Sequence, residues 1–161
     1  MENLVDYIKF VTGLAAVVPS SSAPDAVSLK NYDGVLAIIT QKNSTSATGS
    51  AITLKQATTV AGGSEKALGF DFVYLNIDTA AAGGDVLVKT AVVSDTFTTT
   101  SVDSKDSKYI VDINTSSLDA DGDFDIFSVD IADGAANTVN IEYVLYNARY
   151  KPVIADSVIT D

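Results

Sequence analysis

The sequence predicts an all-β fold: an antiparallel β-sandwich or jelly-roll-like single domain with an extended or partly helical N-terminal arm. Three observations lead to this expectation. Short apolar runs rich in β-branched and aromatic residues recur along the chain. Turn-forming pairs such as Gly62-Gly63 and Asp121-Gly122 separate these runs. Finally, 161 residues that are 47% hydrophobic suffice for one sizeable core.

The N-terminal segment differs from the rest of the chain. Residues 1–24 are expected to form an arm and a flexible joint, and residues 25–161 the β-sandwich domain. Helical periodicity is credible mainly near residues 5–18. Pro19 and Pro24 then block the continuation of a helix. The arm is therefore expected to dock on the domain or on a neighbouring molecule.

Strand patterns begin after the arm. About eight of them at this spacing are typical of a sandwich or a barrel. In chain order they are "GVLAIIT" (34–40), "SAITLKQA" (50–57), "LGFDFVYLNI" (68–77), "DVLVKTAVV" (85–93), "DTFTTTSV" (95–102), "KYIVDI" (108–113), "FDIFSVDI" (124–131) and "TVNIEYVLYNARY" (138–150). In the last pattern, Val139, Ile141, Tyr143 and Leu145 share one face.

One acidic stretch raises the question of a metal site. Its alternating carboxylates could be calcium ligands: Asp119, Asp121, Asp123 and Asp125. An EF-hand loop that starts at Asp119 would place Phe124 where a glycine is required, and no helical pattern flanks it. We therefore interpret the stretch as a polar turn before a strand, with a looser calcium site as the alternative.

Composition restricts the chemistry. The chain has neither cysteine nor histidine, which removes thiolate nucleophiles, Ser-His-Asp catalysis and nearly all zinc sites. We therefore expect that the protein is not an enzyme and binds no cofactor. The alternative is an enzyme that uses paired carboxylates such as Asp71 and Asp125, but only the presence of these acids supports it. The formal net charge is −11, the lysines are scattered and Arg149 is the single arginine, so nucleic acid and anionic membranes are not expected partners.

Three stretches together resemble a group of small structural proteins of tailed bacteriophages. They are "DAVSLKNYDGVLAIIT" (25–40), "AITLKQATTVAGGSEKALGFDFVY" (51–74) and "VNIEYVLYNARYKPVIADSVITD" (139–161). The resemblance implies a virion component of the head-decoration, or cement, type. Such a protein binds the major capsid protein on the outer capsid surface, commonly as a homotrimer, and stabilises the head.

In this role, two groups of residues are expected to contact the partner. The first lies in the arm: Tyr7, Ile8, Phe10, Val11 and Leu14. The second lies in the late aromatic strand, where tyrosine and arginine are typical of interfaces: Tyr143, Tyr146, Arg149 and Tyr150. The alternative is that both groups only cover the domain core.

Two other functions remain open. One is a different virion component, such as a head-fibre base or a tail protein. The other is a carbohydrate-binding β-sandwich module, which needs an exposed aromatic platform. The chain has no tryptophan for this purpose, although Tyr32, Tyr74 and Tyr109 could serve.

Overall fold

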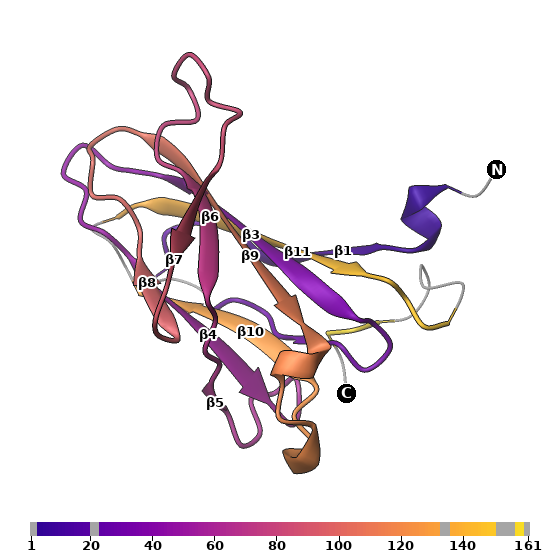
Figure 1. The fold of residues 1–161 in the computed structure, drawn as a ribbon. Coiled ribbons are helices and arrows are strands. Elements are labelled where there is room, and N and C mark those ends of the chain that lie inside the picture. Colours follow the sequence, from indigo (N-terminus) through magenta and orange to yellow (C-terminus); the bar gives the residue numbers. More distant parts are fainter. Residues whose placement is uncertain (1–2, 20–22, 133–135, 151–156, 160–161) are drawn as a thin grey trace.

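The computed structural model describes residues 3–19, 23–132, 136–150 and 157–159, which form two antiparallel β-sheets packed together (Figure 1). The predicted all-β sandwich is confirmed. The strands are β1 (Lys9–Val17), β2 (Val27–Ser28), β3 (Gly34–Lys42), β4 (Ala51–Ala57), β5 (Lys66–Ala67), β6 (Phe72–Asn76), β7 (Val88–Ala91), β8 (Thr96–Thr98), β9 (Asp106–Asn114), β10 (Ile126–Ile131) and β11 (Thr138–Tyr146). Short 3-10 turns are labelled η1 (Leu4–Asp6), η3 (Thr115–Ser117) and η4 (Ala120–Gly122).

The two sheets differ in size and in the length of their strands. The larger sheet has the order β1-β11-β3-β9-β6-β7, so β1 and β7 are its edges. The smaller sheet has the order β2-β10-β4-β5, and β8 also pairs with β4. Its edges β2 and β5 are only two residues long. Long central strands and short edge strands are a common way of limiting unwanted edge pairing.

The core lies between the sheets and follows the alternation of the sequence. In β11 the side chains predicted to share one face, from Val139 to Leu145, are all fully buried. In β10, Phe127 and Val129 are equally buried, and β3 contributes Val35, Ala37 and Ile39. Because side chains alternate between the faces of a strand, these residues meet in one apolar layer.

The expectation of a helix near residues 5–18 is wrong. Only Leu4–Asp6 forms a 3-10 turn, and the next residues form β1, which pairs with β11. The apolar spacing fits either structure, and pairing with a long central strand decides in favour of β1. Residues 9–17 of the expected arm thus belong to the sandwich, while the joint at residues 20–22 lies outside the described residues.

Tyr143 joins the two sheets across the core. Its ring packs edge-on against Phe127, with ring centroids 5.7 Å apart, and its hydroxyl accepts a hydrogen bond from the Val129 N–H at 3.2 Å. The ring lies directly under Gly13 of β1, where an added Cβ would approach Tyr143 Cε2 to 2.4 Å. Burial raises the pKa of the Tyr143 phenol well above its usual range.

We expect Tyr143→Phe to lower the free energy of unfolding by about 1–3 kcal/mol, because the buried Val129 N–H loses its partner. Urea unfolding measures the change. Tyr150→Phe is the matched control, since Tyr150 is 73% exposed, and its effect is expected to stay within about 0.5 kcal/mol. Equal stability of Tyr143→Phe and the wild type would show that the hydrogen bond is not needed.

Gly13→Ala tests the close approach of β1 to the same ring. The new methyl group must displace either Tyr143 or the strand, so we expect a loss of about 1–3 kcal/mol. Gly69→Ala is the control, because an added Cβ there meets no atom within 4 Å. Similar urea midpoints for the two variants would contradict the assigned role of Gly13.

Candidate interaction surface

The segment that leads into β1 and the segment that follows β11 both carry exposed apolar side chains. We call this group the N-terminal corner; its members, with their exposed fractions, are Leu4 (71%), Val5 (51%), Phe10 (60%) and Tyr150 (73%). Phe10 pairs with Val144 in the sheet. The Ala148 N–H donates to the Tyr7 carbonyl at 3.4 Å, which ties the two segments together. The local pairing therefore brings the segment before β1 and the segment after β11 side by side.

Tyr146 and Arg149 lie next to this corner but are held by the chain itself. The Tyr146 hydroxyl donates to Asp112 Oδ1 at 2.8 Å. An added Cβ at Gly34 would lie 2.3 Å from the same hydroxyl, which explains the glycine at that position. Arg149 Nε lies 3.5 Å from Asp33 Oδ1. Burial, and next the Asp112 carboxylate, raise the pKa of Tyr146 well above its usual range.

The residues expected to contact a partner differ in their exposure to solvent. Phe10, Arg149 and Tyr150 are exposed, whereas Tyr7, Ile8, Val11 and Tyr146 are half-buried. Leu14 and Tyr143 are buried in the core, which corrects their expected place at a contact surface. Alternation within β11 points Tyr143 inward. Leu14 faces inward after an irregularity in the β1 register between Thr12 and Leu14.

The acidic stretch forms the turn that precedes β10. Asp119 caps η4, since its Oδ1 accepts a hydrogen bond from the Gly122 N–H at 3.3 Å, and its other oxygen forms an ion pair with Lys66. The Lys66 ammonium also lies 3.9 Å from the centroid of the Phe124 ring. Lys66 lowers the pKa of Asp119. Among the described residues, no group of three or more acidic side chains is placed to hold a metal ion.

A second apolar surface was missed by the sequence reasoning. It lies at the opposite edge of the larger sheet, on β7 and the residues beside it. Its exposed members are Val86 (61%), Leu87 (39%), Val88 (58%) and Val93 (101%). The loop between β6 and β7 extends beyond the neighbouring strands (Figure 1). The apolar run "VLVKTAVV" predicts a strand, but not that its side chains remain uncovered.

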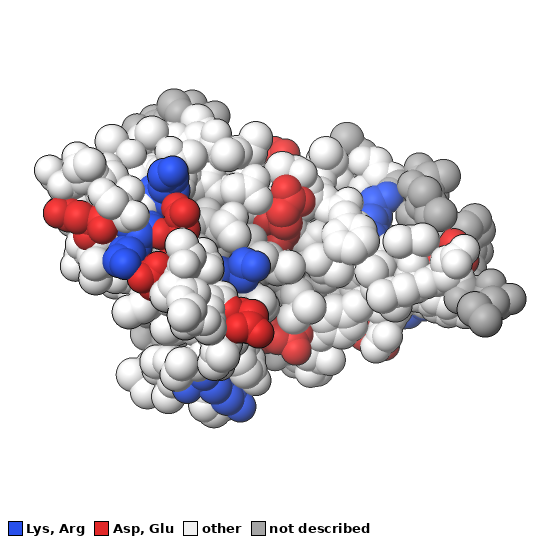
Figure 2. All heavy atoms as spheres, turned by 90° about the horizontal axis from the view of Figure 1, so that it is seen from above, with Lys and Arg blue, Asp and Glu red and all other residues white. Residues whose placement is uncertain are grey.

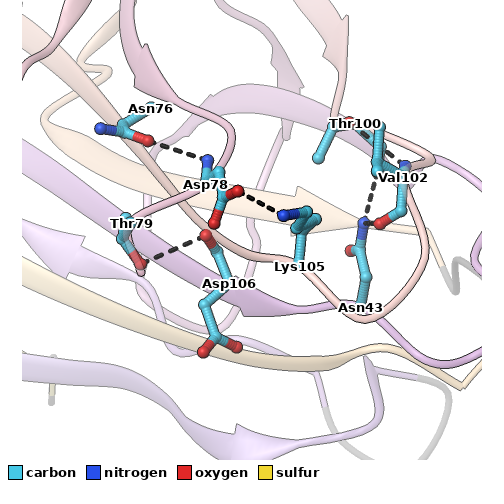
Figure 3. Close-up of polar contacts among 8 residues, drawn as sticks. All are labelled: Asn43, Asn76, Asp78, Thr79, Thr100, Val102, Lys105 and Asp106. Carbon is cyan, nitrogen blue, oxygen red and sulfur yellow. Dashed lines mark hydrogen bonds and ion pairs between the residues drawn. The ribbon is translucent and has the colours of Figure 1, made fainter. Parts of the chain in front are cut away.

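Polar contacts hold the loops at one end of the sandwich. Buried Asn43 donates from Nδ2 to the carbonyls of Thr100 and Val102, at 3.1 and 2.7 Å (Figure 3). Lys105 forms an ion pair with Asp78, in the segment that leaves β6. Each contact joins loops that are distant in sequence. These polar residues therefore stabilise the loops, which accounts for their presence without a ligand.

Two of the three tyrosines named for a carbohydrate-binding platform are buried. Tyr32 and Tyr109 are 2% and 1% exposed, so neither can form an exposed platform for a sugar. Tyr74 is half-buried, with the Lys89 ammonium 5.6 Å from its ring centroid. Asp71 and Asp125 line different surface depressions and do not form a carboxylate pair.

Charged side chains on the face shown in Figure 2 are scattered. Lysine and arginine lie beside carboxylates or apart from one another, with uncharged surface between them. In β4, Lys55 contacts both Glu65 and Asp130, at 2.9 and 3.0 Å. No continuous basic area is visible on this face. Within the described part of the chain, no helix has the length and apolar character needed to cross a membrane.

The fold and surfaces define a two-sheet antiparallel β protein with exposed apolar edges. Comparison with known proteins adds no relative, since no family model, curated protein or solved structure matches the chain.

Stability is expected to fall at alkaline pH because the folded state holds Tyr143 and Tyr146 neutral. The unfolded chain releases these protons near pH 10. The stabilisation is thus complete below about pH 10 and is lost progressively as the pH rises from there towards the higher folded pKa values. Urea midpoints measured between about pH 8 and 11 should fall less steeply in Tyr143→Phe and Tyr146→Phe than in the wild type. Parallel profiles for all three proteins would contradict this assignment.

Proposed function

We propose that this chain is a capsid decoration protein, which binds the major capsid protein on the outside of a tailed-phage head and stabilises the shell. It would act in the virion without catalysis. The observation that carries the proposal is the N-terminal corner, where exposed Leu4, Val5, Phe10 and Tyr150 belong to two segments that the backbone pairing brings together. Single exposed apolar residues are ordinary, but a group of them is typical of an interaction surface.

Other features of the molecule are compatible with a protein that stabilises a shell by binding to it. Tyr143 and its neighbours make a rigid support for β1, which carries Phe10. A fixed side chain loses little freedom on binding, so its contact contributes more to affinity. The acidic charge keeps unbound copies soluble. The identity of the partner as a capsid protein rests on the resemblance of the three stretches to phage structural proteins.

The test is co-sedimentation of the purified protein with shells of the parent virus from which it has been removed. We expect saturation at a fixed number of copies per shell. Phe10→Ser should weaken binding about tenfold or more, because it removes an exposed aromatic side chain from the proposed contact. Val102→Ser is the control: Val102 is 47% exposed and lies in the loop between β8 and β9.

The possible outcomes test the decoration function and the role of the N-terminal corner separately. Absence of saturable binding by the wild type would overturn the decoration function. Saturable binding that Phe10→Ser and Val102→Ser reduce equally would keep the function but remove the N-terminal corner from the contact. Near-ultraviolet circular dichroism confirms that each variant retains its packing.

A further inference from the structure

The β7 edge, defined as residues 86–93, has an unusual exposure for a strand of a sandwich. All four residues of β7 are exposed. Val88 and Thr90 pair with Leu75 and Val73 of β6, and opposite residues of paired strands share a face. Val73 is only 2% exposed and belongs to the core, whereas Val88 is 58% exposed. The side of β7 that faces the core layer is therefore left uncovered.

The backbone of β7 also has groups available for pairing. The Val92 N–H donates to the Asp71 carbonyl at 2.7 Å, and Ala91 lies opposite Phe72. Hydrogen-bonded and non-hydrogen-bonded pairs alternate in an antiparallel ladder. The N–H and C=O groups of Lys89 and Ala91 therefore point away from β6. Among the described residues, no turn, loop or side-chain hydrogen bond reaches these groups.

The other sheet edges are protected. In β1 the register is interrupted twice, and the Gly13 carbonyl accepts a hydrogen bond from the Asp25 N–H at 2.7 Å. The Ser28 N–H of β2 donates to the Val158 carbonyl at 2.8 Å. Bulges, covering segments and very short strands are the usual means of protecting an edge. The register of β6 with β7 shows no such interruption, and the run 86–93 contains no proline.

We propose that β7 pairs with β7 of a second copy of this chain, antiparallel and about a two-fold axis at Thr90. This goes beyond the decoration function and does not depend on it. The register places Lys89 opposite Ala91 of the second copy, and Val88 opposite its Val92. A symmetric contact of this type uses the same surface on both copies and closes as a dimer.

The positions of the charged residues favour this register and a second copy as the partner. Pairing about Lys89 would place the two ammonium groups opposite each other, which is destabilising. The axis at Thr90 avoids this and places two threonines together, a favourable cross-strand pair. The chain carries a net charge of −11, but residues 86–93 contain no carboxylate. Lys89 itself lies over the Phe72 ring, 3.8 Å from its centroid. Two copies that pair along this edge therefore place no carboxylates of this run opposite each other.

The first test is sedimentation equilibrium of the full-length chain over a wide range of protein concentration. We expect a monomer–dimer equilibrium, which Val88→Lys should weaken about tenfold or more by placing a charged side chain opposite the apolar Val92 of the second copy. Val102→Lys carries the same charge change at another exposed valine and should have little effect. A monomer at all concentrations, a trimer such as the resemblance implies, or a dimer that both variants weaken equally would overturn the inference.

The second test uses the absence of cysteine from the chain. Across the proposed axis the two Thr90 residues form a non-hydrogen-bonded pair, with Cα atoms about 4.5 Å apart, which is within the range of a disulfide. Thr90→Cys should therefore oxidise to a covalent dimer much faster than Val102→Cys at equal concentration. Equal rates would overturn the register even if Val88→Lys were unstable. Shell binding is measured separately, so failure of the dimer and failure of the decoration function are distinguishable.

Discussion

The contact on which the rest of the structure depends is the Tyr143 side chain between the two sheets. Its ring fills the layer beside Phe127, and its hydroxyl satisfies a backbone N–H of β10 at a position beyond the two-residue strand β2. The same ring requires a glycine at position 13. One side chain thus packs between the sheets, satisfies a backbone N–H of β10 and lies against β1 at Gly13.

This contact explains why the N-terminal segment forms a strand instead of a separate arm. With Gly13 above the ring, β1 lies close enough to β11 to pair along its length, and its irregular register lets Leu14 point inward. Phe10, on the regular part of the strand, remains exposed. The surface proposed to contact the shell is therefore connected to the core through β1, its pairing with β11 and the contact of Gly13 with Tyr143. A helix over the same residues would have lost the ladder with β11.

The sequence predicted the central strands because their alternation is strong and their burial is complete, as in β10 and β11. It also predicted a polar turn at Asp119, since aspartate and glycine fit a turn whatever surrounds them. The alternation in β11 also placed Tyr143 on the apolar face and Tyr146 on the opposite one, so the expected place of Tyr143 at a contact surface did not follow from the pattern. The sequence could not predict the exposure of β7, because an apolar run is the same in a central and an edge strand. Strand order, which depends on contacts between distant residues, decides that question.

Strand order also connects the two proposals. β1 and β7 are the opposite edges of one sheet, so a dimer formed through β7 would carry its two N-terminal corners at its two far ends. Each corner is a small contact and would bind weakly alone, but two corners on one rigid body bind a shell with a much higher effective affinity. Such a dimer could bridge neighbouring capsid subunits, and its continuous sheet would resist their separation. The protected edge would then serve the shell and the unprotected edge the second copy, which gives a physical reason for the difference between them.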